Sequence, residues 1–146
     1  MRRIFLAACL ALVAAGAAQA ADFVVVKSTD PAIKAGTPVN GGQRLNLATG
    51  QTVVLLAAAG DLTKLKGGAS GATAPARRTA QVDASKLESL RVLIDPPPAG
   101  RTFGGRRGGV CPDPSQLTTI DDILGVQGAC PEAARQALTA YANKAN

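Results

Sequence analysis

Residues 42–65, GQRLNLATGQTVVLLAAAGDLTKL, decide the fold class of this 146-residue chain. Leu45 and Leu47 flank a polar residue, and this period of two is typical of a strand with one buried face. Residues 52–56, TVVLL, are apolar without alternation and rich in β-branched side chains. This pattern predicts a strand that is covered on both faces and is therefore central in its sheet.

Two glycines divide this stretch into strands. Gly50 and Gly60 can both adopt the positive φ that a tight reversal needs. After the second reversal, residues 62–65 alternate again and carry Lys64 outward, as expected of an edge strand. The alternative is a short buried helix over residues 53–59, which three alanines favour. The glycines leave room for only about nine residues, however, and helices usually need more.

The chain before this stretch continues the β pattern. Residues 22–27, DFVVVK, predict a strand, and the turn residues STDP follow it. Residues 33–39 predict a short extended piece at an edge or in a loop, because Pro38 has no N–H to donate to a ladder. Short strands separated by glycine turns over residues 21–66 therefore predict a small antiparallel β-sandwich or barrel, in a chain that is mainly β with some α.

The first 20 residues have the layout of a secretory signal peptide. A positive start precedes an apolar run over residues 4–15, and the small-x-small sequence AQA precedes a cut between Ala20 and Ala21. The alternatives are a retained anchor and a lipoprotein, since Cys9 lies in a lipobox-like sequence. The apolar run is shorter than the ~20 residues that span a bilayer, and Cys9 is followed by more apolar sequence. We expect a periplasmic or secreted protein without a transmembrane span after cleavage.

Composition limits the chemistry that this chain can perform. There is no histidine, which excludes Ser–His and Cys–His catalytic systems. Asp121 and Asp122 are adjacent and point to different sides of a helix, which is unsuited to joint acid–base work. No tryptophan, one tyrosine and three phenylalanines leave little aromatic surface for stacking sugars or bases. We therefore expect no enzyme activity, no cofactor and no nucleic-acid partner.

Cys111 and Cys130 are the two cysteines that remain after cleavage, and they predict one disulfide in an oxidising compartment. Closing the loop of residues 112–129 constrains the unfolded chain by about 3 kcal/mol. The alternatives are a redox pair and a metal site. The chain has no C-x-x-C sequence, and two thiolates without any histidine cannot form an ordinary zinc site.

Between the β region and the cysteines the sequence changes character. Residues 67–84, GGASGATAPARRTAQVDA, predict a flexible linker or a long surface loop. Residues 85–94 predict a short amphipathic helix, because Ser85 and Glu88 have the spacing of a capping box. Its predicted packing face contains Leu87, Leu90 and Ile94.

Residues 95–110 predict a loop rich in proline, glycine and arginine. Arginines among glycines occur in RGG-type nucleic-acid segments, but one short copy in an exported chain favours a solvated loop. A second hypothesis is contact of Arg101, Arg106 and Arg107 with anionic cell-wall polymer or lipid headgroups. The net charge is +6 and falls to +4 after cleavage, with 14 basic and 10 acidic residues, so scattered charge alone gives little affinity.

Residues 111–146 predict a helical tail held by the disulfide. The first helix has Leu117, Ile120 and Leu124 on one face, with Thr118 or Thr119 as its cap. The second begins at Pro131, which suits a first helical position. Its thin apolar face is formed by Ala134, Ala137, Leu138 and Tyr141. Such small faces bury too little to hold without a covalent staple.

Several sequence features recur together in one known layout. They are VVVKS at 24–28, AGTPVNGGQRLNLATGQTVVLLAAAG at 35–60, LTKLKGG at 62–68 and the later helix KLESLRVL at 86–93. Over residues 23–65 the chain resembles the periplasmic β domain of FecR-type regulators and small exported Gram-negative proteins of unassigned role. The resemblance implies a periplasmic β domain. FecR regulators also have a membrane span and a cytoplasmic segment that this sequence lacks, so no signalling role is carried over. The resemblance includes no catalytic or ligand motif, so no functional residue is carried over either.

These observations favour a non-enzymatic binding or structural module of the bacterial cell envelope. Its partner would be an envelope protein or an anionic envelope polymer, contacted by an edge or loop face of the β domain. One alternative is a periplasmic carrier of a small molecule or metal, which predicts a concave pocket with convergent polar groups. The other is a secreted inhibitor-like factor.

The cleavage site gives a first testable prediction. Expression of the full chain in a Gram-negative host should yield a protein that begins at Ala21, because small residues precede the cut. N-terminal sequencing and intact mass of the periplasmic fraction measure this. A protein that retains residues 1–20, or one that carries lipid on Cys9, would contradict it.

Overall fold

The computed structural model describes residues 21–76, 83–98 and 110–145. The strands are β1 (Phe23–Ser28), β2 (Pro38–Val39), β3 (Arg44–Leu45), β4 (Thr52–Ala57), β5 (Leu62–Lys66) and β6 (Ala72–Thr73). The helices are α1 (Ala84–Ile94), α2 (Ile120–Val126) and α3 (Pro131–Asn143), with a 3₁₀ turn at Pro114–Gln116. The predicted combination of antiparallel sheet, short helices and one disulfide is confirmed, as two open sheets and not a closed barrel.

The main sheet is antiparallel with the strand order β2-β1-β4-β5, and β3 pairs with β6 in a second, two-stranded sheet. The predicted positions of three segments are confirmed: residues 52–56 lie in the central strand β4, residues 62–65 in the edge strand β5, and Pro38 in the edge strand β2. The alternative of a helix over residues 53–59 is wrong. Val53, Val54, Leu55 and Leu56 are all at most 2% exposed, because both faces of β4 are covered.

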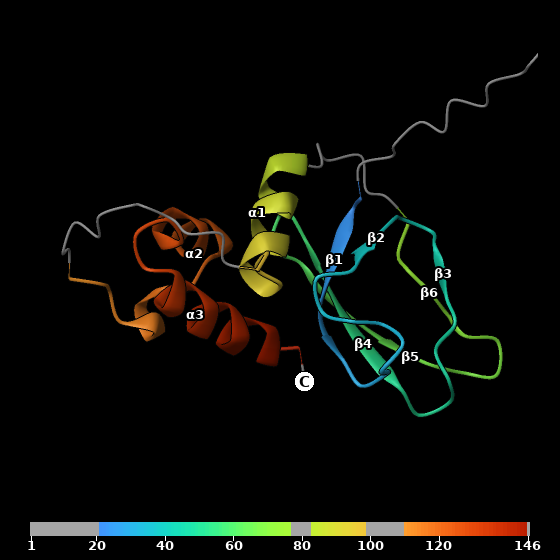
Figure 1. Ribbon diagram of the computed structural model, residues 1–146. Helices are drawn as coiled ribbons and strands as arrows, with labels where there is room; N and C mark the ends of the chain where they lie inside the picture. Colours follow the sequence, from blue (N-terminus) through green and yellow to red (C-terminus); the bar gives the residue numbers. More distant parts are fainter. Residues whose placement is uncertain (1–20, 77–82, 99–109, 146) are drawn as a thin grey trace, which may run out of the picture.

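The fold has three layers, with the main sheet in the middle. Figure 1 shows the helices on one side of this sheet and the β3–β6 pair on the other. Val24 of β1 and Leu56 of β4 point into the helical layer, in a cluster that includes Leu90, Ile123 and Leu138. The opposite face forms a second cluster with Phe23, Val25, Leu45, Leu47, Val53 and Leu55. Adjacent residues of β1 and β4 therefore serve different cores, as the two-residue period of a strand requires.

The first part of the predicted linker belongs to the β domain. Ala72 and Thr73 pair with β3, and Ala74 is buried in the second cluster, whereas residues 77–82 lie outside the described residues. The sequence has no apolar periodicity here because a two-residue strand is too short to show one. Gly67 lies very close to the chain that follows β3. A Cβ atom at Gly67 would lie 2.0 Å from the Ala48 carbonyl oxygen. Only glycine permits this approach.

Helix α1 begins one residue earlier than predicted, and its cap is different. The Asp83 carboxylate accepts hydrogen bonds from the N–H groups of Ser85 and Lys86, so Asp83 and not Ser85 is the N-cap. The Ser85 hydroxyl, the Lys86 N–H and the Ser85 N–H together lower the pKa of the Asp83 carboxyl. The buried face contains Leu87, Leu90 and Leu93, and the predicted Ile94 is only partly buried.

The predicted disulfide cross-links the helical tail. The Cys111–Cys130 disulfide is present, with 5.7 Å between the two Cα atoms, and it joins the segment before the 3₁₀ turn to the N-cap of α3. Helix α3 begins at Pro131, and its buried residues include Ala134, Ala137 and Leu138. The three-residue face predicted for the preceding helix needs correction.

Helix α2 begins only at Ile120, where Thr119 and Asp122 form a capping box. Leu117 therefore precedes the helix, because the 3₁₀ turn takes up this part of the chain. Ile120 and Ile123 are the buried residues of α2. The predicted Leu124 is partly buried.

A polar contact at the β4–β5 turn helps to fasten the tail to the sheet. The hydroxyl of Tyr141, in α3, donates a hydrogen bond of 2.7 Å to the carbonyl oxygen of Gly60 in the β4–β5 turn. Gly60 has a φ of +96°, and a Cβ there would lie 3.0 Å from that hydroxyl. The turn and the helix thus lock together. Within the described part of the chain, no helix is long and apolar enough to cross a bilayer.

Removing the staple should destabilise the protein without changing the sheet. The double variant Cys111→Ala/Cys130→Ala is expected to lose about 3 kcal/mol of unfolding free energy, because the loop it releases regains entropy in the unfolded state. Urea denaturation followed by circular dichroism measures this. Reductant should lower the stability of the natural protein to the same level and leave the double variant unchanged; equal stability of all forms would contradict the prediction.

Candidate binding surface at the open edge of the sheet

The strand β5 ends the main sheet, and its ladder with β4 shows which main-chain groups it uses. The Gly67 N–H donates to the Gln51 carbonyl (2.8 Å), and the Ala57 N–H donates to the Asp61 carbonyl (3.0 Å). Opposite residues in an antiparallel ladder alternate between hydrogen-bonded and non-hydrogen-bonded pairs. The register from Thr52↔Lys66 to Leu56↔Leu62 lies between these two bonded pairs.

It follows that Thr63 and Leu65 direct their N–H and C=O groups toward β4. Leu62, Lys64 and Lys66 direct theirs away from it, toward the open edge. Among the described residues, no hydrogen bond is made by the main-chain groups of these three residues outside the sheet. The edge is therefore free to pair with another extended chain.

The same residues carry positive charge on one face. Lys27 of β1 and Lys64 of β5 both lie opposite Val54 of β4, and Lys66 lies opposite Thr52. Residues directly opposite one another share a face of the sheet, so these side chains form one group. We call Lys27, Lys64 and Lys66 the lysine face. All three are exposed, whereas Val54 between two of them is 2% exposed.

A β-bulge brings Lys27 to this face. The register of β1 with β4 shifts between Val25 and Lys27, which leaves Val26 as the extra residue. Without the bulge, strict alternation would turn Lys27 to the opposite side of the sheet. The Nζ of Lys27 instead donates to Oδ1 of Asn143 at the end of α3 (3.3 Å). The lysine face thus lies on the helical side of the sheet, beyond the end of the helical layer.

The C-terminal end of α3 adds a fourth cation nearby. Lys144 follows Asn143, and its Nζ lies 4.9 Å from the centre of the Tyr141 ring. Among the described residues, none of these four lysines forms an ion pair. In contrast, three cations of the helical layer are paired.

Those paired cations are Lys86 with Asp121 (2.6 Å), Arg135 with Glu132 (2.7 Å) and Arg91 with Glu88 (3.7 Å). The Asp121 carboxylate raises the pKa of Lys86 by hydrogen bonding and by its charge. These pairs neutralise the helical side locally. The lysine face is therefore the place on the described surface where several cations stand together without anionic partners.

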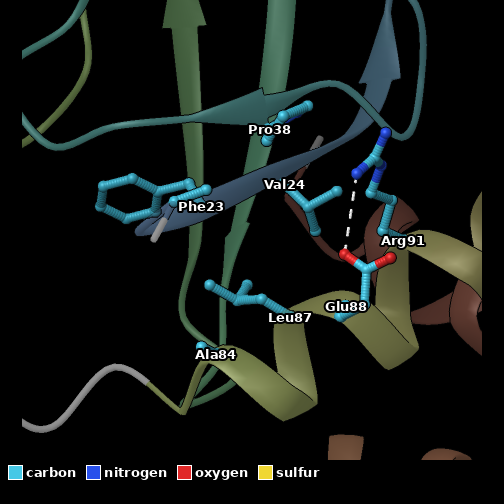
Figure 2. Close-up of a pocket in the computed structure, with 8 residues that line it drawn as sticks. Phe23, Val24, Pro38, Ala84, Leu87, Glu88 and Arg91 are labelled. Carbon is cyan, nitrogen blue, oxygen red and sulfur yellow. Dashed lines mark ion pairs between the residues drawn. The ribbon is translucent and has the colours of Figure 1, made fainter. Parts of the chain in front are cut away.

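Two of the concave places on the described surface border helix α1. The smaller, of about 170 Å³, lies between β1, β2 and the start of α1. Figure 2 shows Val24 and Leu87 between these elements, with the Glu88–Arg91 ion pair at the edge. Its wall is apolar and its one acid is already paired. It therefore resembles a packing gap between two layers more than a site for a charged ligand.

The larger groove, of about 520 Å³, lies between α1 and the start of α3. Val92, which is 45% exposed, forms part of its wall. Arg135 donates from Nε to the Leu93 carbonyl (3.3 Å) and so holds the two helices together across it. The groove is open and most of its exposed lining is apolar, although Glu88, Gln127 and Arg135 also line it.

No group of three or more acidic or cysteine side chains that could hold a metal occurs among residues 21–76, 83–98 and 110–145. Asp122 caps α2 and Asp121 pairs with Lys86, so both have structural partners. The predicted contact residues Arg101, Arg106 and Arg107 lie outside the described residues. Comparisons of the chain with protein-family models, curated proteins and solved structures find no match.

Sequence reasoning found only part of this surface. The alternation of residues 62–65 placed Lys64 outward on an edge strand, and the same alternation extended by one step would have added Lys66. Lys27 could not be placed, because the bulge at Val26 has no sequence signature here. The surface thus combines two strands, β1 and β5, and Lys27 and Lys64 are 37 residues apart in the sequence.

If the lysine face does not support the fold, removing the charges of its lysines should change the free energy of unfolding very little. The variant Lys64→Gln/Lys66→Gln is expected to change the free energy of unfolding by less than about 0.5 kcal/mol, because both side chains are exposed and neither has an ion-pair partner among the described residues. The control Tyr141→Phe should lose about 1 kcal/mol with its hydrogen bond to Gly60. Urea denaturation measures both. A loss in the lysine variant as large as in the control would show that these lysines support the fold.

Proposed function

We propose that this protein is an exported, non-enzymatic binding module of the bacterial cell envelope that holds an anionic component on the lysine face. The observation that carries the proposal is the cluster itself: Lys27, Lys64 and Lys66 share one face of a rigid sheet and have no ion pair among the described residues. Like charges placed side by side destabilise a fold slightly. Such an arrangement is understandable if an anionic partner completes it.

The scaffold beneath the cluster suits a binding role. β4 is buried on both faces, so the strands that carry the lysines are held in fixed register. The cations therefore keep a constant spacing without a ligand. This preorganisation lowers the entropic cost of binding. Lysine is a compact charge with three donors and suits phosphate, sulfate or carboxylate groups.

Export is supported by two observations of different kinds. The first 20 residues have the pattern of a cleaved signal peptide, and the Cys111–Cys130 disulfide fits an oxidising compartment such as the periplasm. The resemblance of residues 23–65 to FecR-type periplasmic domains points to the same location. We propose that the mature protein begins at Ala21 and acts in the periplasm or outside the cell.

The arginines of the 95–110 loop belong to the same proposal. Arg101, Arg106 and Arg107 would add charge to the contact with an anionic polymer. Because they lie in a different part of the sequence from the lysine face, separate variants can divide their contributions.

The experiment compares binding of two charge-matched variants to isolated cell envelopes. Lys64→Gln/Lys66→Gln should weaken sedimentation with envelope material at low salt by about tenfold, whereas Lys34→Gln/Lys86→Gln, with the same net charge, should bind nearly normally. Added salt should release the natural protein, since exposed charges are screened within about 10 Å at 0.1 M.

A third variant, Arg101→Gln/Arg106→Gln/Arg107→Gln, measures the part played by the loop. Equal loss in both lysine pairs would mean that net charge alone matters and would contradict a site on the lysine face. Turnover of an envelope substrate by the purified protein would contradict the non-enzymatic role.

A further inference from the structure

We propose that the anionic partner is an extended acidic segment of another protein, which adds to the open edge of β5 as a further strand. The inference rests on the proposed function and specifies its partner. It is carried by a coincidence of two features at the same residues. Lys64 and Lys66 carry the exposed charges, and they are also the residues whose main-chain groups point to the open edge.

The outward main-chain groups of β5 match those of an added strand. Leu62, Lys64 and Lys66 present outward N–H and C=O groups over the length of β5. An added strand can exchange hydrogen bonds with each of them, as in other cases of β-strand addition. A polysaccharide or a lipid headgroup has no matching row of alternating donors and acceptors.

The spacing of the lysine side chains along β5 also matches an extended partner. Lys64 and Lys66 are two residues apart and lie on one face, about 7 Å from each other along the strand. An extended partner also repeats its side chains on one face every second residue. Acidic residues at alternate positions of the partner would therefore stand opposite the two lysines, where opposite charges stabilise a cross-strand pair.

The same geometry disfavours other occupants. A second copy that paired edge to edge through β5 would bring lysines together, and like charges directly opposite are destabilising. A membrane would require apolar side chains to insert. In the described chain the large exposed hydrophobic residues are Val92 in α1 and Val110 before Cys111, and neither belongs to the sheet.

The lysines thus have two consistent effects on the edge. They prevent pairing with identical copies, which is the ordinary use of lysine on an exposed strand. They also favour a strand of opposite charge. Specificity obtained by repelling wrong partners while attracting the right one is common in protein recognition.

The test uses two synthetic heptapeptides of identical composition with blocked ends. The first, TEVEVET, places glutamates at alternate positions, and the second, TEEVVET, has no two glutamates that are two residues apart. Strand addition predicts that the alternating peptide binds at least threefold more tightly in isothermal titration, because only its acidic side chains all lie on one face. Polyglutamate and anionic lipid vesicles serve as probes of simple charge attraction.

Amide hydrogen exchange supplies the readout that side-chain attraction would not change. Binding of TEVEVET should slow exchange at the N–H groups of Leu62, Lys64 and Lys66. Thr63 and Leu65 serve as internal controls, because their N–H groups already bond to β4 and should change little.

Two variants of one residue separate charge from main-chain pairing. Lys64→Gln removes the charge and keeps the outward N–H, and it should weaken the alternating peptide about threefold. Lys64→Pro removes both while leaving the ladder to β4 intact, since an edge strand tolerates proline where the N–H faces solvent. It should weaken binding at least tenfold. If the proline variant does not fold, the exchange measurement on the natural protein decides.

Three results would overturn strand addition: equal affinity for both peptides, no slowing at Lys64 and Lys66, or equal losses in folded Lys64→Gln and Lys64→Pro. Each of them, combined with retained binding to envelopes, would leave the lysine face as a simple anion-binding surface and preserve the proposed function. Absence of binding to peptides, polyglutamate, vesicles and envelopes alike would overturn both.

Discussion

Burial of β4 on both faces is the constraint on which the rest of this structure depends. Its four central side chains are almost completely inaccessible. Leu56 belongs to the core on the helical side, and Val53 and Leu55 belong to the core on the opposite side. Because neither core is large, each layer needs the sheet between them to complete its apolar surface. The helical layer and the β3–β6 pair are consequently attached to the same strand, and their positions are fixed relative to each other.

Two local features fix the positions of surface groups relative to β4. The turn between β4 and β5 is held by Tyr141, whose hydroxyl bonds to the Gly60 carbonyl. The bulge at Val26 turns Lys27 toward the helical side. The disulfide secures the first part of the tail, whose short helices would otherwise be marginal. Together these features hold an unpaired strand edge and a group of unpaired lysines in fixed positions without a bound partner.

A surface of this kind differs from a catalytic pocket in what it requires of the protein. Catalysis needs groups brought into a shielded site with altered pKa values. In the described residues the two acids with lowered pKa values, Asp83 and Asp113, are cap residues of helical turns. Recognition through an edge strand needs only a rigid ladder, an exposed row of main-chain groups and charges at the right interval. The β5 edge, with Lys64 and Lys66 on one face, has these features.

The amino-acid sequence was sufficient to predict the elements that depend on local pattern. The unbroken TVVLL run predicted a central strand, Pro131 predicted the start of α3, and the only two cysteines left after the predicted cleavage site predicted each other as partners. It could not predict β6, because two residues show no period, nor the Asp83 cap, because Ser85 offered an equally good pattern. The lysine face, in contrast, depends on tertiary contacts. Register, and the one-residue bulge that alters it, depends on contacts between distant segments, and these determine on which side of the sheet Lys27 lies.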